Sequence, residues 1–338
     1  MTTARATAII DAADPGALDR AAAALAAGAL VALPTETVYG LCALARRDDA
    51  VAAVYAAKGR PARNPLIVHG ADAAAVAALG TLGPAALRLA EKFWPGPLTI
   101  VARRAPGAAV SPLASAGGDT VALRVPEAPF FRTVAARVGP IVAPSANRSG
   151  RVSATAATAV AEELGGRIAL IVDGGPSPIG VESTVVEMVD TPRLLRPGAL
   201  SREAIEAVIG PLAGVAGTDD GGAADDGRAA LPSPGLLSSH YAPRARLRLD
   251  VPAADVRADE GWLALGNQPS AAAQAHTVRL STTGDLDEAA RALYCGLRML
   301  DATGVAVIAV SPVPAHGIGA AIRDRLARAA APRPEDTP

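Results

Sequence analysis

Short apolar segments alternate with helix-forming segments through the first 210 residues, and this alternation limits the possible folds most strongly. Asp14-Pro15 precedes an Ala- and Leu-rich run that ends at Gly28, so this run carries helix start and stop signals at its two ends. A fully apolar segment follows and ends at Pro34, as is typical of a buried strand. The pattern predicts a layered α/β domain.

The alternation continues beyond Pro34. Strands are predicted at 29–33, 66–69, 97–102, 120–125, 140–143, 168–172, 183–189 and 193–196, and helices at 15–27, 49–57, 71–79, 84–93, 129–138, 155–164 and 201–209. A short turn joins the last two strands, whereas parallel neighbours need a longer crossover. The sheet is therefore predicted to be mixed.

The chain also predicts a second, smaller domain. It has 338 residues, and a single hydrophobic core rarely grows beyond about 250–300 residues. From Gly210 to Gly235 the composition changes to Gly, Ala, Asp and Pro without apolar periodicity, as in a linker. Strands at 245–249, 262–265 and 305–310 and helices at 286–300 and 318–330 follow. The predicted parts are a first domain at 1–210, a linker at 211–243 and a second domain at 244–338.

Composition excludes several classes of protein. No apolar stretch approaches the roughly 18 residues of a membrane-spanning helix, and the N-terminus lacks the layout of a secretory signal. Cys42 and Cys295 lie far apart, without the spacing of a zinc site. A formal charge of -1 gives no electrostatic reason to wrap nucleic acid. We expect a cytoplasmic protein with no membrane partner and weak or no direct binding to nucleic acid.

Lys58 is the most informative cation. The chain has 32 basic residues, of which only Lys58 and Lys92 are lysine, so a lysine at this position is unusual. Lys58-Gly59-Arg60 ends a predicted helix, and two cations around a glycine suit a phosphate chain. Capping of the helix by basic residues is the alternative.

Other polar clusters follow predicted strands, where open α/β sheets usually bind ligands. PTETVYG at 34–40 is as consistent with a capped turn as with a binding site. FWPGPLT is more consistent with packing than with a binding site. Thr120 and Arg124 share one face of a strand, where the arginine could hold a carboxylate or form an ordinary salt bridge. The loop 143–155 offers hydroxyl and amide groups before a helix, as an anion site or a solvated loop.

Seven segments in this order closely resemble the YrdC-like family of threonylcarbamoyl-adenylate synthases: PTETVYG, KGRPARNPLIVH, FWPGPLTIV, VALRVP, PSANRSG, DGGPSPIGVESTVV and LLRPG. The resemblance covers residues 10–210, and SPGLLSSHYAP with the second domain resembles the longer two-domain form. It implies an α/β fold with a twisted mixed sheet and flanking helices, followed by a smaller Rossmann-like domain. The linker would act as a lid, although it lacks the basic residues expected before HYAP.

The resemblance also assigns residues, by matching motifs. It gives catalytic roles to Lys58 and Arg60. ATP contacts would come from Lys58, Arg60, Asn64, Thr120, Ser145, Asn147, Ser153, Arg196 and Tyr241. L-threonine contacts would come from Thr37, His69, Arg124, Ala143 and Ser183, with Arg124 on the carboxylate. No residue is assigned to a metal, because Mg²⁺ would enter with ATP.

The implied reaction joins threonine, bicarbonate and ATP to threonylcarbamoyl-AMP, pyrophosphate and water. The product would pass to the transferase machinery that modifies adenosine in ANN-decoding tRNAs. The main alternative is an RNA-binding module of the same fold without turnover. A carbamoyl-transfer domain of hydrogenase maturation is disfavoured because its zinc-binding and acylphosphatase-like segments are absent from this sequence. A protein that only senses nucleotide is a third alternative.

Overall fold

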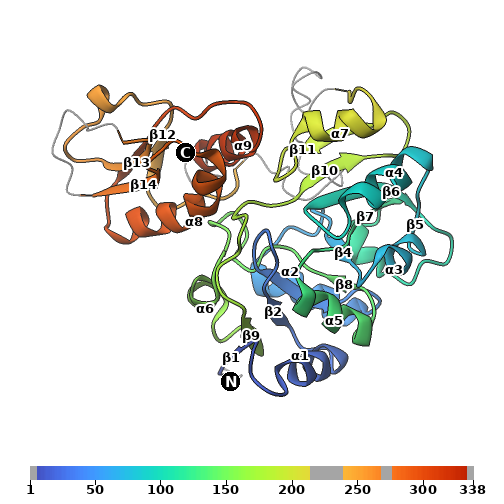
Figure 1. The fold of residues 1–338 in the computed structure, drawn as a ribbon. Helices are drawn as coiled ribbons and strands as arrows, with labels where there is room; N and C mark the ends of the chain where they lie inside the picture. The colour runs from blue at the N-terminus through green and yellow to red at the C-terminus, as the bar shows by residue number, and fades with distance from the viewer. Residues whose placement is uncertain (1–5, 214–238, 268–275, 333–338) are drawn as a thin grey trace. The chain divides into compact units, whose positions relative to one another are not determined.

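The computed structural model describes residues 6–213, 239–267 and 276–332 (Figure 1). The chain divides into two compact units, which are described separately. The first unit comprises Met1–Ser149, Ala154–Ser177 and Glu182–Leu236, and the second comprises Gly150–Ser153, Pro178–Val181 and Leu237–Pro338. Most of the predicted linker, 214–238, lies outside the described residues, and the predicted domain boundaries stay a prediction.

A mixed sheet forms the centre of the first unit. Its strands are β1 (Ala8–Asp11), β2 (Val31–Leu33), β3 (Gly40–Leu44), β4 (Ile67–His69), β5 (Gly80–Thr81), β6 (Leu98–Arg104), β7 (Thr120–Arg124), β8 (Ile141–Val142), β9 (Leu170–Asp173), β10 (Thr184–Glu187) and β11 (Arg193–Arg196). Their order is β1-β9-β2-β3-β8-β4-β7-β6-β10-β11, and β5 pairs with β6. β10 and β11 are antiparallel, as predicted, whereas β4 and β7 are parallel.

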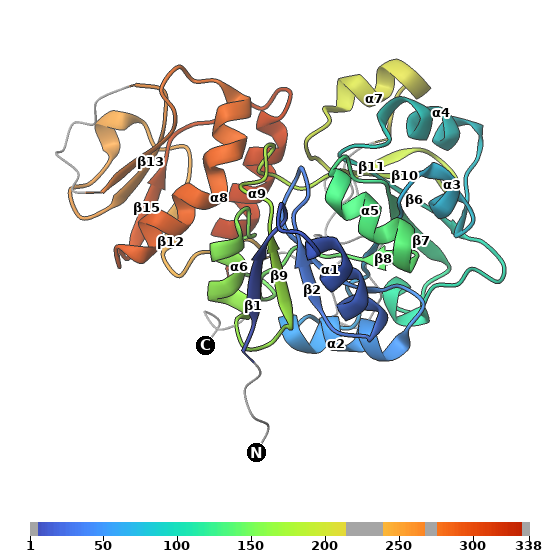
Figure 2. The ribbon, with the colours of Figure 1, turned by 60° about the horizontal axis from the view of Figure 1, so that its bottom comes forward.

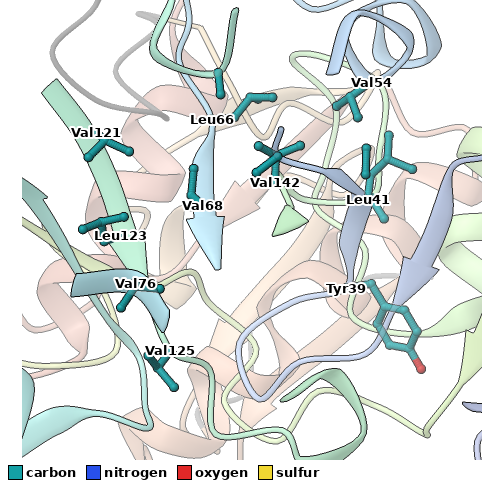
Figure 3. Close-up of a cluster of buried hydrophobic side chains, with 14 of the residues drawn as sticks. Tyr39, Leu41, Val54, Leu66, Val68, Val76, Val121, Leu123, Val125 and Val142 are labelled. Carbon is teal, nitrogen blue, oxygen red and sulfur yellow. The ribbon is translucent and has the colours of Figure 1, made fainter. Parts of the chain in front are cut away.

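Helices cover both faces of this sheet. They are α1 (Ala17–Ala26), α2 (Asp48–Lys58), α3 (Ala73–Ala77), α4 (Pro84–Phe93), α5 (Pro129–Val138), α6 (Ala157–Leu164) and α7 (Arg202–Ile209). α1 and α5 lie side by side and share one apolar cluster (Figure 2). The larger cluster contains residues of α2, α3, α4, α6 and α7. In Figure 3, Leu41, Val142, Val68 and Leu123 contribute to it from neighbouring strands.

The two clusters follow from the alternation of side chains along each strand. In β2, Ala32 belongs to the larger cluster, and Val31 and Leu33 belong to the cluster under α1 and α5. Every β2 residue is buried, which explains why the segment is apolar throughout instead of alternating with polar residues. The sheet is therefore the middle layer of the unit.

Local sequence signals predict most helix ends to within two residues. Pro84 and Pro129 occupy the first turns of α4 and α5, where a missing N–H costs no hydrogen bond. Gly59 ends α2 in the left-handed region, at φ 61°. The predicted helix starts at 15, 71 and 155 were each wrong by two residues, since the helices begin at Ala17, Ala73 and Ala157. In the first case, Ala17 N–H bonds to Asp14 C=O in a preceding turn. β1, β3, β5 and a strand of the second unit, β14 (Thr277–Ser281), were not predicted.

The second unit contains a four-stranded parallel sheet. Its strands are β12 (Arg246–Arg248), β13 (Gly261–Leu265), β14 (Thr277–Ser281) and β15 (Val307–Val310), in the order β12-β15-β13-β14. The helices are α8 (Leu286–Ala302) and α9 (Gly319–Ala330). All three pairings are parallel, in agreement with the expected Rossmann-like architecture. Within the described ranges, no helix is long and apolar enough to cross a membrane.

Candidate active site

Four side chains form a row across one face of the first unit's sheet. His69 and Arg124 are register partners at the ends of β4 and β7. The antiparallel register of β6 and β7, continued by one residue, sets Thr99 opposite Arg124. Ser183 directly precedes β10, and its Oγ lies 2.8 Å from Thr99 Oγ1. Because β4, β7, β6 and β10 are consecutive in the sheet, the row spans about three strand spacings, or roughly 14 Å.

Arg124 is held from two sides by segments distant in the sequence. Its Nε donates to Gly96 C=O at 3.2 Å, and its Nη2 donates to Glu36 Oε1 at 2.5 Å. Arg124 and Glu36 side chains are each only 5% exposed, so the pair is buried. The segment FWPGPLT, which the sequence indicated was mainly structural, thus supplies a carbonyl that orients a predicted threonine contact.

His69 is uncharged at neutral pH. Burial, followed by the nearby Arg124 charge, lowers its pKa to about 3. Its Nδ1 lies 3.1 Å from Ile67 C=O, which accepts the hydrogen bond if Nδ1 carries the proton. The ring also lies against Phe131 of α5, with centroids 5.4 Å apart. A neutral imidazole can bind a polar ligand without adding charge beside Arg124.

The β2–β3 turn presents Thr37 in a fixed orientation. Thr35 Oγ1 donates to Val38 C=O at 2.6 Å, and Thr37 Oγ1 lies 2.9 Å from Thr35 Oγ1. Since the Thr35 hydroxyl proton is already used, Thr37 must donate to Thr35, which leaves the lone pairs of Thr37 for another donor. Ala143, another predicted contact, is buried, and its N–H bonds to Ile67 C=O.

Ser183 connects the predicted threonine contacts to a predicted ATP contact. Arg196 Nη2 donates to Ser183 C=O at 3.0 Å and to Ser183 Oγ at 3.3 Å. Gly198 lies so close that a Cβ there would be 2.4 Å from the carbonyl carbon of Ser183. The close approach of LLRPG to this strand therefore depends on a glycine.

Lys58 contacts the loop that contains Ser145 and Asn147. Its Nζ donates to both carbonyl oxygens at 2.5 Å. Asn147 is fully buried, and its Nδ2 donates to Arg148 C=O at 2.8 Å. The loop is joined to the β2–β3 turn by the bond from Ala146 N–H to Tyr39 C=O. The structure thus brings together the separate motifs KGR and PSAN.

The surroundings of Lys58 disfavour its charged form. The side chain is buried, and burial lowers its pKa well below the usual value. The Arg60 guanidinium lowers this pKa further, whereas the carboxylates of Glu163 and Glu182 raise it. A bound polyphosphate would add negative charge and favour the ammonium form.

Arg60 and Asn64 form a separate buried pair. Arg60 Nη2 donates to Asn64 Oδ1 at 2.6 Å, and Arg60 Nε donates to Asn64 C=O at 3.0 Å. Asn64 Nδ2 is buried and has no hydrogen-bond partner in the part of the chain that the structure describes. Thr120, at the start of β7, is four residues or about 13 Å from Arg124. It therefore lies at the other end of the strand from the four-residue row.

Two predicted ATP contacts, Ser153 and Tyr241, belong to the second unit. Ser153 is fully buried. Tyr241 is 1% exposed, and its ring stacks on Tyr294 with centroids 5.8 Å apart. The Arg325 guanidinium carbon lies 5.1 Å from the Tyr241 ring centroid. Both roles stay predictions, as do the ATP and threonine roles of the residues in the first unit.

Sequence reasoning missed three residues of this site. Glu36 lies within PTETVYG, but no pattern indicated that its carboxylate would pair with an arginine 88 residues away. Gly96 and Thr99 were attributed to a turn and a strand. Among the described residues, no group of three or more His, Cys, Asp or Glu side chains could hold a metal ion.

Two family models match the chain. "Telomere recombination", the model for Sua5, YciO and YrdC proteins, matches residues 23–198, and "Threonylcarbamoyl-AMP synthase, C-terminal domain" matches residues 200–331. Together they cover both parts of the chain.

Similar proteins match over nearly their full length. Threonylcarbamoyl-AMP synthase of Bacillus subtilis is 42% identical, with 93% of each chain covered. The protein of that name from Pyrococcus abyssi is 41% identical, with 89% of this chain and 90% of the relative covered.

The solved structure of P. abyssi Sua5 complexed with L-threonine has a TM-score of 0.86 and 36% identity, and covers 96% of this chain and 98% of that one. A variant of that protein, with a histidine and a tyrosine replaced by alanine, matches with a TM-score of 0.85 and 35% identity, and covers 96% of each chain. The chain belongs to the threonylcarbamoyl-AMP synthase family.

Proposed function

We propose that this protein is an L-threonylcarbamoyladenylate synthase, a nucleotidyltransferase that forms threonylcarbamoyl-AMP from L-threonine, bicarbonate and ATP. The observation that carries the proposal is the position of Ser183. Its hydroxyl is hydrogen-bonded to Thr99 in the row with Arg124 and His69, and also to Arg196. An amino acid on the row would therefore lie beside a cation suited to a phosphate.

The chemistry relies on positioning instead of a covalent nucleophile. Bicarbonate and the threonine amine form a carbamate with loss of water, and a carbamate oxygen then attacks the α-phosphorus of ATP and releases pyrophosphate. Arg124 would hold the threonine carboxylate, and Lys58 and Arg60 would bind the phosphates. Mg²⁺ would enter as a complex with ATP and neutralise part of the phosphate charge. Burial of these groups strengthens their electrostatic interactions and excludes water.

The cellular role follows as part of the same proposal. The product would supply the transferase machinery that modifies adenosine in ANN-decoding tRNAs. Both cysteines are free, which fits a reducing compartment such as the cytoplasm. The balanced charge supports release of a small-molecule product over direct binding to tRNA.

Pyrophosphate release tests the function directly. With ATP, Mg²⁺, bicarbonate and L-threonine we expect release that requires both threonine and bicarbonate, and that stops when EDTA removes the metal. Lys58→Ala should lower the rate by about 100-fold or more, because a contact to the reacting phosphates is lost. The matched control is Lys92→Ala, which changes the only other lysine, an exposed residue of α4.

Release without threonine, or equal rates in the two lysine variants, would contradict the assignment. Salt-dependent tRNA binding by folded protein that never releases pyrophosphate would favour an RNA-binding module instead.

A further inference from the structure

The hydrogen bonds of Arg124 leave one nitrogen available to a ligand. Nε and Nη2 are occupied by Gly96 and Glu36, whereas Nη1 has no hydrogen-bond partner among the residues that the structure describes. Arg124 is only 4% exposed, but Nη1 is not among the fully buried atoms that lack a partner, so a ligand can still reach it. A carboxylate approaching this nitrogen would be bound close to the carboxylate of Glu36.

Glu36 also has an unused hydrogen-bonding atom. Its Oε1 accepts from Arg124, but Oε2 is buried and accepts no hydrogen bond from any residue in the described ranges. A buried carboxylate oxygen without a donor is costly, because desolvation is not repaid. The terminal torsion of a glutamate is soft, so a small rotation can present either oxygen to a ligand. The neighbouring Thr35 hydroxyl does not help, because it already donates to Val38 C=O.

Charge balance identifies what this oxygen would accept. Two carboxylates on one guanidinium repel each other unless a second cation lies between them. In an amino acid, the ammonium is attached to the carbon next to the carboxylate, which is the position where that cation is needed. We infer that Glu36 binds the α-ammonium of L-threonine while Arg124 binds its carboxylate. This inference rests on the proposed function. The buried pair thus recognises the amino acid as a zwitterion.

The alternative is that Glu36 only orients Arg124. The two roles predict different effects of losing Glu36 on the binding of a ligand that keeps the carboxylate and hydroxyl of threonine but lacks its amine. (R)-3-Hydroxybutanoate is that ligand. If Glu36 only orients Arg124, its loss weakens both ligands alike, whereas loss of an ammonium contact weakens threonine alone.

The experiment is calorimetric titration of both ligands into the full chain. Wild-type protein should bind L-threonine at least about 10-fold more tightly than (R)-3-hydroxybutanoate, because the charged contact is present only with threonine. Glu36→Gln should weaken threonine binding by about 10- to 100-fold and leave (R)-3-hydroxybutanoate binding unchanged or stronger. ATP affinity, measured on the same samples, should stay at the wild-type value. Glu91→Gln, on the exposed face of α4, is the matched control.

Equal binding of both ligands by the wild-type protein would overturn the inference without any variant. An equal loss for both ligands in Glu36→Gln would assign Glu36 to orienting Arg124. If Glu36→Gln fails to fold, Glu36→Asp retains the charge at a shorter reach and should reduce the preference for threonine. If the wild-type protein binds ATP but not threonine, the proposed function fails instead.

Discussion

At the scale of residues, ionisable side chains are buried and each is held by a directed partner. Arg124 and Glu36 neutralise each other at 5% exposure, and Lys58 at 3% exposure contacts two carbonyl oxygens. Such groups cost free energy in a protein without ligand, because each loses hydration. A charged substrate can recover part of that cost when it binds. The same burial keeps His69 neutral, and this has a consequence for stability.

His69 should make the protein sensitive to mild acid. In the unfolded chain it gains a proton near pH 6.5, whereas the folded protein resists protonation down to about pH 3. Between these values the unfolded state binds more protons, so stability falls as pH falls below about 6.5. His69→Gln should reduce this loss by up to about 1.4 kcal/mol per pH unit. Urea unfolding at pH 7.5 and pH 5 measures the difference.

The control for that measurement is His316→Gln, because His316 is exposed. It should show the wild-type dependence on pH. An identical loss of stability in all three proteins between pH 7.5 and pH 5 would mean that His69 is not buried as a neutral ring.

At the scale of elements, the site depends on how closely loops approach strands. The β2–β3 turn delivers Glu36, and the turn before β6 delivers the carbonyl of Gly96. The segment after β11 lies against the backbone before β10, which leaves no room for a side chain at position 198, where the chain has Gly198. Each of these segments is short, so the neighbouring strand fixes its position.

Gly198→Ala should damage both stability and binding. A Cβ would lie 2.3 Å from Thr184 N and 2.5 Å from Glu182 O, so backbone must move. We expect a loss of about 1–3 kcal/mol, as in other overpacked sites, seen as a lower melting temperature. Weaker L-threonine binding should accompany it, because Ser183 lies in the displaced segment. Gly83→Ala is the control: a Cβ there meets nothing within 4 Å, and wild-type binding is expected. Wild-type stability of Gly198→Ala would show that the contact relaxes freely.

At the scale of the whole molecule, each unit has its own sheet and its own apolar core. The first unit contains most of the residues assigned to ATP and all of those assigned to threonine. Ser153 and Tyr241 are the exceptions, since both belong to the second unit. The resemblance therefore predicts that turnover needs the full chain.

A fragment of residues 1–213 tests this dependence. If Tyr241 and the preceding linker contact ATP, the fragment should release pyrophosphate at least about 10-fold more slowly than the full chain, because a positioning contact is lost. L-threonine binding by the fragment, measured by calorimetry, controls for correct folding of the first unit. Unchanged pyrophosphate kinetics in the fragment would contradict the role of the linker as a lid.

The sequence by itself determined the classes of element, most helix ends and the motifs that belong to the family. These features are local: Pro84 and Pro129 begin helices, Gly59 ends one, and the apolar β2 segment shows that it is buried on both faces. Only the tertiary structure decided that β4, β7, β6 and β10 are neighbours, and hence that His69, Arg124 and Ser183 share a row. It also decided that Glu36 pairs with Arg124. Alternation along a strand shows which side chains share a face, but packing between distant segments decides which strands meet.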